Sequence, residues 1–160
     1  MSRLAILALR FVILVIAIGA IGAQAFIVPV IAAVLAGSSD HPEVGLPYTV
    51  VGIAIIACVE IALVAVWVLL SMVHRGRIFV AHAFGWVDTI VWAAAAATVL
   101  VAGLGAHIYF VVEPVIDAPG VILVLFCLTI LGGGFTLLLV VMRSLLQSAT
   151  ALQSELEEVV

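Results

Sequence analysis

The sequence of 160 residues contains no lysine, and its basic residues are five arginines. Charged residues of both signs make up 9% of the chain, against about 25% in ordinary soluble domains. The formal net charge is −4 and no basic cluster is present, which excludes direct binding of nucleic acid. The two cysteines, Cys58 and Cys127, lie far apart inside apolar stretches and form no CxxC motif. We interpret them as packing residues, which excludes a redox pair or a zinc site.

Apolar residues dominate instead, at 68% of the sequence. A soluble domain of this size cannot hide so much apolar surface from water, whereas a lipid bilayer solvates it. Four apolar stretches stand out, at about residues 11–36, 48–73, 87–112 and 121–142. Each exceeds the roughly 20 residues that cross about 30 Å of hydrocarbon. The sequence predicts an all-α fold: a four-helix transmembrane bundle forming a single membrane domain over residues 1–160, with a helical tail at 143–160.

The arginines predict how this domain is oriented. They precede the first span, separate the second from the third and follow the fourth, at Arg3, Arg10, Arg75, Arg77 and Arg143. With an even number of spans, all five lie on one side of the membrane. The positive-inside rule makes that side cytoplasmic. We expect a multi-pass protein of the cell membrane with its N- and C-termini in the cytoplasm.

The N-terminal segment has features of a signal peptide, because Arg3 is followed by apolar residues and by Ala23-Gln24-Ala25. The apolar run nevertheless continues past Ala25 through Val34, as a membrane-spanning helix requires. We therefore expect this segment to remain in the protein as its first span.

Glu60 is the residue that a membrane interior tolerates least. It lies near the middle of the second span, twelve residues after Tyr48, where an acidic group costs about 2.5–3.5 kcal/mol to insert. Gln24 lies at nearly the same depth in the first span, so the two residues are a candidate intramembrane polar pair. One interpretation is a proton or cation site, or an anchor for a partner's polar group. The other is a protonated glutamate that is hydrogen-bonded to a neighbouring helix.

Histidines and acidic residues do not form a recognisable catalytic or metal site. Only His107 lies inside a predicted span, which excludes a haem held by two histidines and predicts a hydrogen-bonded interfacial side chain. Asp88 begins the third span, where we expect it to cap the helix and to pair with Arg75 or Arg77. The G-x-S-x-G, P-loop and H-E-x-x-H motifs are absent. We expect a non-enzymatic protein with no catalytic residue, no metal and no cofactor.

Small residues in the third and fourth spans predict close contacts between helices. Residues 93–97 are all alanine, and Gly103 and Gly105 follow. The fourth span contains Gly132-Gly133-Gly134. Small side chains let membrane helices approach closely, and a hinge at the three glycines is the second interpretation.

The C-terminal tail carries a heptad pattern. Apolar residues recur at spacings of four and three, at Leu145, Ala149, Leu152, Leu156 and Val159. Acidic residues near the end oppose both the helix dipole and an anionic membrane surface, so the tail is expected to stand off the bilayer. Its seam either packs on the inner loop or receives a cytoplasmic partner. The candidate partner-binding residues are Arg75, Arg77, Leu145, Leu152, Leu156, Glu155, Glu157 and Glu158.

Several motifs add a family resemblance that covers nearly the whole chain. They are Ser71-Met72-Val73-His74-Arg75-Gly76-Arg77-Ile78-Phe79, Ala83-Phe84-Gly85-Trp86-Val87-Asp88, Val141-Met142-Arg143-Ser144-Leu145-Leu146 and Glu155-Leu156-Glu157-Glu158-Val159-Val160. With them the sequence resembles a family of bacterial integral membrane proteins, domain of unknown function 2975, in its actinobacterial form. Relatives are often neighbours of a small helix-turn-helix regulator. The resemblance thus implies a membrane partner that modulates a transcription factor.

Three functional hypotheses follow. The first is a non-enzymatic membrane regulator or accessory protein that binds a small cytoplasmic helix-turn-helix regulator. The second is a small proton- or ion-coupled transporter, dimeric or otherwise oligomeric, that uses Glu60. The third is a structural subunit of a larger membrane complex, assembled through its alanine- and glycine-rich faces. The lipid bilayer is a partner in all three, and we favour the first.

Overall fold

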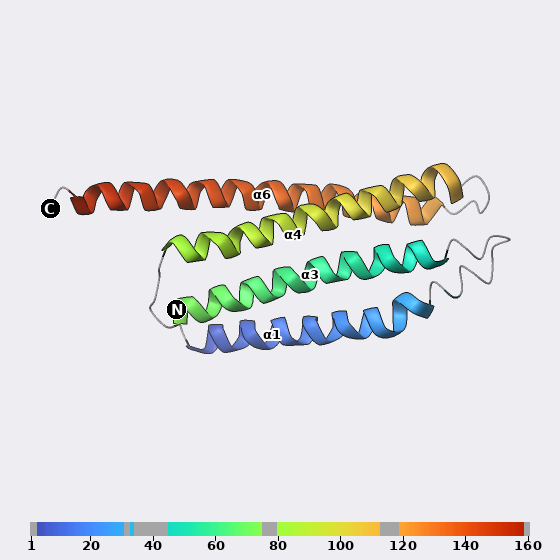
Figure 1. Ribbon diagram of the computed structural model, residues 1–160, viewed down its shortest axis with the longest axis horizontal. Coiled ribbons are helices and arrows are strands. Elements are labelled where there is room, and N and C mark those ends of the chain that lie inside the picture. Colours follow the sequence, from blue (N-terminus) through green and yellow to red (C-terminus); the bar gives the residue numbers. More distant parts are fainter. Residues whose placement is uncertain (1–2, 31–32, 34–44, 75–79, 113–118, 159–160) are drawn as a thin grey trace.

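The computed structural model describes residues 3–30, 33, 45–74, 80–112 and 119–158. Its elements are α1 (Arg3–Gly22), the π-helical turn η1 (Ala23–Ile27), α3 (Gly45–His74), α4 (Val80–His107), the π-helical turn η3 (Ile108–Val112) and α6 (Pro119–Glu158) (Figure 1). Four segments are long and apolar enough to cross a membrane, at Ile6–Val30, Leu46–Met72, Phe84–Val111 and Gly120–Leu152. The all-helical class and the four candidate spans agree with the sequence-based prediction.

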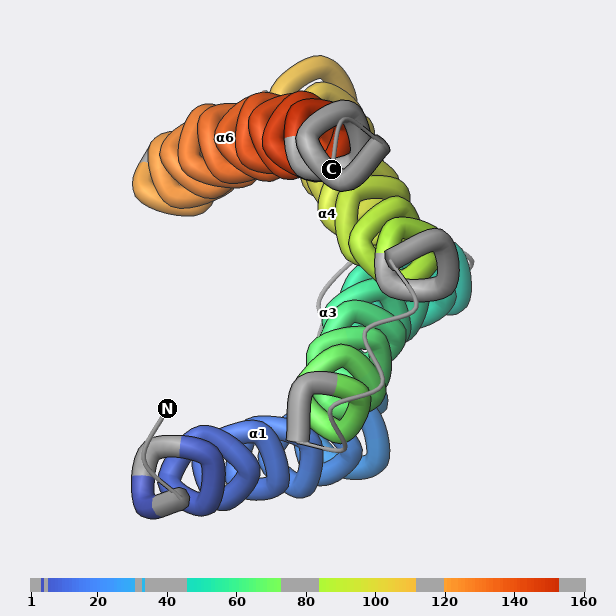
Figure 2. Tube along the Cα trace, turned by 90° about the vertical axis from the view of Figure 1, so that its left-hand side faces the viewer, coloured from blue at the N-terminus to red at the C-terminus, as the bar shows by residue number. Residues whose placement is uncertain are grey.

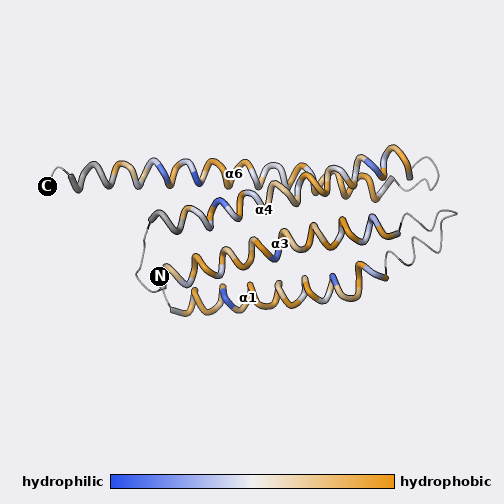
Figure 3. Tube along the Cα trace, viewed as in Figure 1, coloured by the Kyte–Doolittle hydropathy of each residue, from blue (hydrophilic) through white to orange (hydrophobic). Residues whose placement is uncertain are grey.

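Several polar side chains of the apolar helices form hydrogen bonds with the backbone of their own helix, as a lipid environment requires. Figure 3 shows apolar residues along most of each helix, with isolated hydrophilic positions between them. Three threonine hydroxyls donate to the carbonyl one turn earlier, each at 2.8 Å, from Thr98 to Ala94, from Thr129 to Leu125 and from Thr136 to Gly132. These bonds satisfy hydroxyl groups that would otherwise have no partner among apolar side chains.

The four long helices form an open arc. The main contacts follow chain order, from α1 to α3, from α3 to α4 and from α4 to α6. Viewed end-on, α1 and α6 lie at the two ends of the arc (Figure 2). The predicted bundle is therefore an open row of helices, and five apolar residues are buried in the part that the structure describes: Ile6, Ile13, Ala65, Leu70 and Ala93. Because lipid is as apolar as leucine, the hydrophobic effect does not force such a row to close around a core.

Glycine allows α4 and α6 to approach closely. A Cβ atom at Gly132 would lie 2.7 Å from Thr98 Oγ1, and one at Gly105 would lie 3.4 Å from Leu125. The prediction of close helix contacts is confirmed at these two glycines. By contrast, an added Cβ atom would meet nothing within 4 Å at Gly103, Gly133 or Gly134. The helix α6 runs unbroken through all three of its central glycines.

Candidate functional site

An ion pair joins α4 to α6 near one end of the helices. Arg143 Nη2 donates to Asp88 Oδ2 at 2.8 Å, and Arg143 Nε faces Asp88 Oδ1. Each side chain is a little over one third exposed. The predicted cap at Asp88 is wrong, because α4 begins at Val80, more than two turns earlier. The partner of Asp88 in the described structure is Arg143, and the expected partners Arg75 and Arg77 lie outside the described residues, so that pairing stays a prediction.

Arg10 lies at the same level on α1. Its Nη2 donates to Ser71 Oγ at 3.5 Å, and its guanidinium carbon lies 5.4 Å from the centroid of the Trp67 ring. Ser71 in turn donates to the Trp67 carbonyl at 2.9 Å. The Nε atom of Arg10 is buried without a hydrogen-bond partner among the described residues. A cation over an aromatic face is stabilised by the ring quadrupole, so α1 and α3 are joined here by a charged contact.

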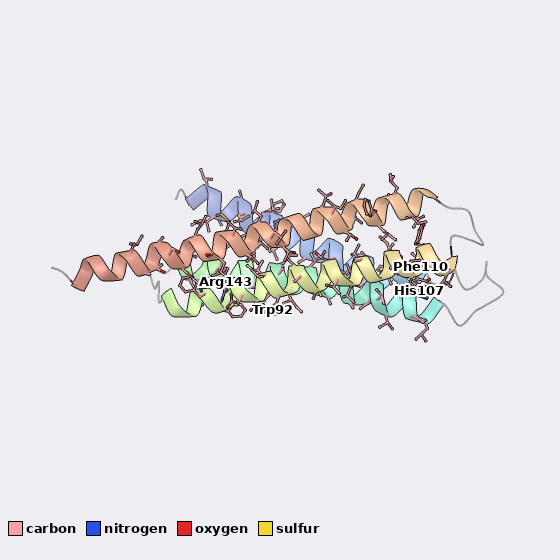
Figure 4. The ribbon with its side chains drawn as sticks, turned by 90° about the horizontal axis from the view of Figure 1, so that it is seen from above. Trp92, His107, Phe110 and Arg143 are labelled. Atoms are coloured by element: carbon pink, nitrogen blue, oxygen red, sulfur yellow. The ribbon has the colours of Figure 1, made fainter. Side chains whose placement is uncertain are left out.

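A second polar contact lies toward the opposite end, between α3 and α4. Tyr48 Oη and His107 Nδ1 share a hydrogen bond of 2.8 Å, and the two rings meet edge to face at 5.7 Å between centroids. Figure 4 places His107 and Arg143 toward opposite ends of the helices. The prediction that His107 forms a hydrogen bond is confirmed, with Tyr48 as its partner, and its interfacial position stays a prediction.

The two polar layers fit the two surfaces of a bilayer. Asp88 and His107 are nineteen residues apart on α4, which is roughly 28 Å at 1.5 Å per residue. The hydrocarbon core of a bilayer is about 30 Å thick. The side chains that can meet headgroups and water therefore lie at both edges of an apolar slab of this thickness.

Glu60 lies inside that slab and lacks a full set of partners. Its Oε1 atom is buried and accepts no hydrogen bond from any described residue. The Nε2 atom of Gln24 is likewise buried without a partner in the described part of the chain. A carboxylate oxygen accepts hydrogen bonds and an amide nitrogen donates them, so these two unpartnered groups are chemically complementary.

The helix register places Gln24 and Glu60 about one turn apart. Arg10 meets Ser71, and a Cβ atom at Gly52 would lie 3.3 Å from Val28 Cγ1, so α1 and α3 run antiparallel. Val28 is level with Gly52, so Gln24, four residues before Val28, is level with residue 56 of α3. Glu60 lies about one turn further along α3. The predicted polar pair is close in depth, yet no hydrogen bond joins its members in the described structure. Buried polar atoms of this kind usually have partners, so a proton, a cation or a partner's polar group fits here.

Two π-helical turns accompany these polar residues. Gln24 lies within η1, and His107 directly precedes η3. A π-helical turn inserts one extra residue and is frequent at functional sites. Sequence reasoning did not foresee either turn. The pairing of Tyr48 with His107 was foreseeable from their matched depth near the predicted outer edge.

The predicted partner surface on the tail is described only in part. Leu145 and Leu152 lie on α6 and are 61% and 62% exposed. The side chains of the remaining tail residues, Glu155, Leu156, Glu157 and Glu158, lie outside the described part, although α6 itself continues to Glu158. Among the described residues, no group of three or more His, Cys, Asp and Glu side chains is arranged to hold a metal ion.

Comparison with known proteins supplies the family. No curated protein and no solved structure matches the chain. The family described as "Protein of unknown function (DUF2975)" matches residues 10–160, which is nearly the whole sequence. The resemblance seen in the sequence motifs is therefore confirmed, and the chain belongs to the DUF2975 family.

Proposed function

We propose that the protein is a non-enzymatic integral membrane regulator or accessory protein that receives a cytoplasmic partner on the extension of α6. The observation that carries this proposal is the length of α6. It continues beyond the ends of α1, α3 and α4 (Figure 1), and it carries the exposed residues Leu145 and Leu152 past the Asp88–Arg143 ion pair. Exposed leucines outside the hydrocarbon are costly unless another surface covers them.

The cytoplasmic orientation is supported by the arginines. Arg10 and Arg143 lie at one level of the described structure, and the other arginines follow or precede the same ends of the helices in the sequence. The positive-inside rule then assigns this side, with both termini and the α6 extension, to the cytoplasm of the cell.

The partner that we propose is a small helix-turn-helix transcription regulator. The family resemblance provides this candidate, because relatives are often neighbours of such a regulator. Charge supports it, since the tail ends in Glu155, Glu157 and Glu158 while DNA-binding proteins present a basic face.

The test is co-purification from native membranes. The full-length chain is compared with a chain that ends at Gln147, and any helix-turn-helix regulator recovered with each is quantified by mass spectrometry. A third variant, in which Glu155, Glu157 and Glu158 are changed to glutamine, keeps the helix length and removes its charge. We expect the regulator with the full-length chain, at least tenfold less with the truncated chain, and an intermediate amount with the neutralised one. Equal recovery from all three chains would refute the proposal.

A second function is favoured by the unpartnered atoms inside the slab. Glu60 Oε1 and Gln24 Nε2 would suit a small transporter that couples transport to a proton or a cation at Glu60. The discriminating change is Glu60→Gln, which removes the titrating group at nearly constant volume. Glu155→Gln, outside the slab, is the matched control. Proton or ion flux in proteoliposomes that survives Glu60→Gln excludes this mechanism.

A further inference from the structure

A continuous apolar seam runs along α6 and has no partner in the described structure. In the tail it consists of Leu145, Ala149 and Leu152, which are exposed, and three of the five residues between them are polar: Gln147, Ser148 and Thr150. Toward the N-terminal end of α6 the same spacing of three and four continues through exposed residues: Met142, Leu138, Phe135, Leu131, Leu128, Val124 and Val121. The tail carries the seven-residue repeat that is typical of helices that supercoil around one another, whereas from Val121 to Met142 the positions between the seam residues are apolar as well, so a helix that packs on the tail seam can continue along the span.

The contact with α4 uses a different face of α6. Arg143, Gly132 and Leu125 meet α4 through Asp88, Thr98 and Gly105. These three residues of α6 fall at the b and e positions of the repeat whose a and d positions form the seam. The a and d residues are exposed because they lie beside this face and outside it. Binding at the seam therefore leaves the α4–α6 contact intact.

The position of the seam relative to the membrane limits which kind of molecule can cover its whole length. Leu152 lies nine residues beyond Arg143, roughly 14 Å further along the helix. The candidate span Gly120–Leu152 is longer than a bilayer is thick, so with Arg143 at the membrane surface, lipid tails cover the part from Val121 to Met142 and Leu152 lies beyond them. A soluble protein reaches Leu145 and Leu152 but not the part inside the bilayer. One occupant that covers the whole seam is a helix that crosses the membrane in the same direction and continues into the cytoplasm.

We infer that this occupant is α6 of a second copy, so that the protein is a homodimer held by a parallel two-stranded coiled coil. Two copies inserted in one orientation place their α6 helices parallel and in register, with a two-fold axis along the membrane normal. Leucine at most d positions favours two strands. The positions that flank the seam between Leu145 and Leu152 are Leu146 and Ser148, which carry no charge, so no like charges oppose each other there.

The dimer is an inference beyond the proposed function. It assigns the predicted partner surface to two partners, a second copy and the regulator. In the described part of the tail, Leu145 and Leu152 contact the second copy. The arginines Arg75 and Arg77 and the acidic end of the tail remain for the regulator. A parallel dimer then presents two equivalent acidic ends to the regulator.

The test is disulfide cross-linking in native-lipid membranes. Cys58 and Cys127 are first replaced by alanine, and single cysteines are introduced at Leu145→Cys, Leu152→Cys and Gln147→Cys. The first two are d positions that face the second copy, whereas position 147 points away from the seam and is the matched control. We expect covalent dimer as the main product at positions 145 and 152, and at least tenfold less at 147. Equal yields at all three positions, or none at any, overturn the inference.

A mass measurement keeps the inference independent of cysteine chemistry. The wild-type chain in mild detergent is expected to have the mass of a dimer, and the double variant Leu145→Gln, Leu152→Gln that of a monomer. Both substitutions lie at exposed positions, so an unchanged circular dichroism spectrum shows that the fold is retained. A monomeric wild type overturns the dimer and leaves binding of the regulator untouched, so the two proposals fail separately.

Discussion

The closest approach between α4 and α6 gives the sharpest structural prediction. A methyl group added by Gly132→Ala would place its Cβ 2.7 Å from Thr98 Oγ1, well inside van der Waals contact. Thr98 yields poorly, because a β-branched side chain on a helix has few rotamers and its hydroxyl already donates to Ala94 at 2.8 Å. Overpacking of this kind costs about 1–3 kcal/mol. The gain in helix propensity on replacing glycine by alanine offsets up to about 1 kcal/mol.

Neighbouring glycines provide the control. A Cβ atom at Gly133 or Gly134 meets nothing within 4 Å, so alanine there is expected to be neutral or stabilising by up to about 1 kcal/mol. In a Thr98→Ala background the clashing atom is gone, and the cost of Gly132→Ala should fall below about 0.5 kcal/mol. Reversible unfolding in mixed micelles with increasing dodecyl sulfate, followed by circular dichroism, measures each free energy. The reasoning fails if Gly132→Ala is as stable as Gly133→Ala, or if Thr98→Ala gives no rescue.

Three further changes test the polar contacts by the same unfolding measurement. Asp88→Asn should lower the free energy of unfolding by about 0.2–1 kcal/mol, because the charge of the pair with Arg143 is lost and solvent screens a pair that is more than one third exposed. The swap Asp88→Arg with Arg143→Asp should recover part of this loss, and no recovery would argue against a specific ion pair. Tyr48→Phe should cost about 0.5–1.5 kcal/mol and should cost nothing further once His107 is replaced by Phe. Additive losses would show that the two residues do not act through one bond. Glu60→Leu should stabilise the protein by about 1 kcal/mol or more, since the buried Oε1 lacks a partner, and a destabilised variant would indicate a structural bond.

The sequence allowed the class of fold and the four candidate spans to be predicted because both depend on composition. An apolar run of more than 20 residues leaves few choices for the backbone, and a helix that satisfies its own hydrogen bonds is the simplest. The close contact at Gly132 was likewise foreseeable, because small residues mark helix contacts. The open arc was not, since nothing in an apolar sequence distinguishes a face that meets lipid from one that meets a helix.

The polar partners were only partly foreseeable. Asp88 was assigned a cap because the apolar run begins nearby, but α4 starts earlier and turns the carboxylate toward Arg143 on α6. Which arginine pairs with Asp88 depends on how α4 and α6 cross, and spacing along the chain does not contain that information. The depth of Glu60 and Gln24 was predicted to within about one turn. Their unpartnered atoms depend on side-chain direction and on the π-helical turn at Gln24, neither of which the sequence pattern reveals.

Regulation through the α6 extension is the central claim, and the output of the partner regulator tests it most directly. A reporter driven by a promoter under the control of the helix-turn-helix regulator that co-purifies with the full-length chain is measured in three strains. They carry the full-length protein, the chain ending at Gln147, or no copy. Membrane insertion of both chains is checked in the same cells. We expect the truncated chain to insert normally and to give the reporter activity of the strain without the protein, with the full-length strain differing from both at least severalfold. The same reporter activity in all three strains would contradict the account.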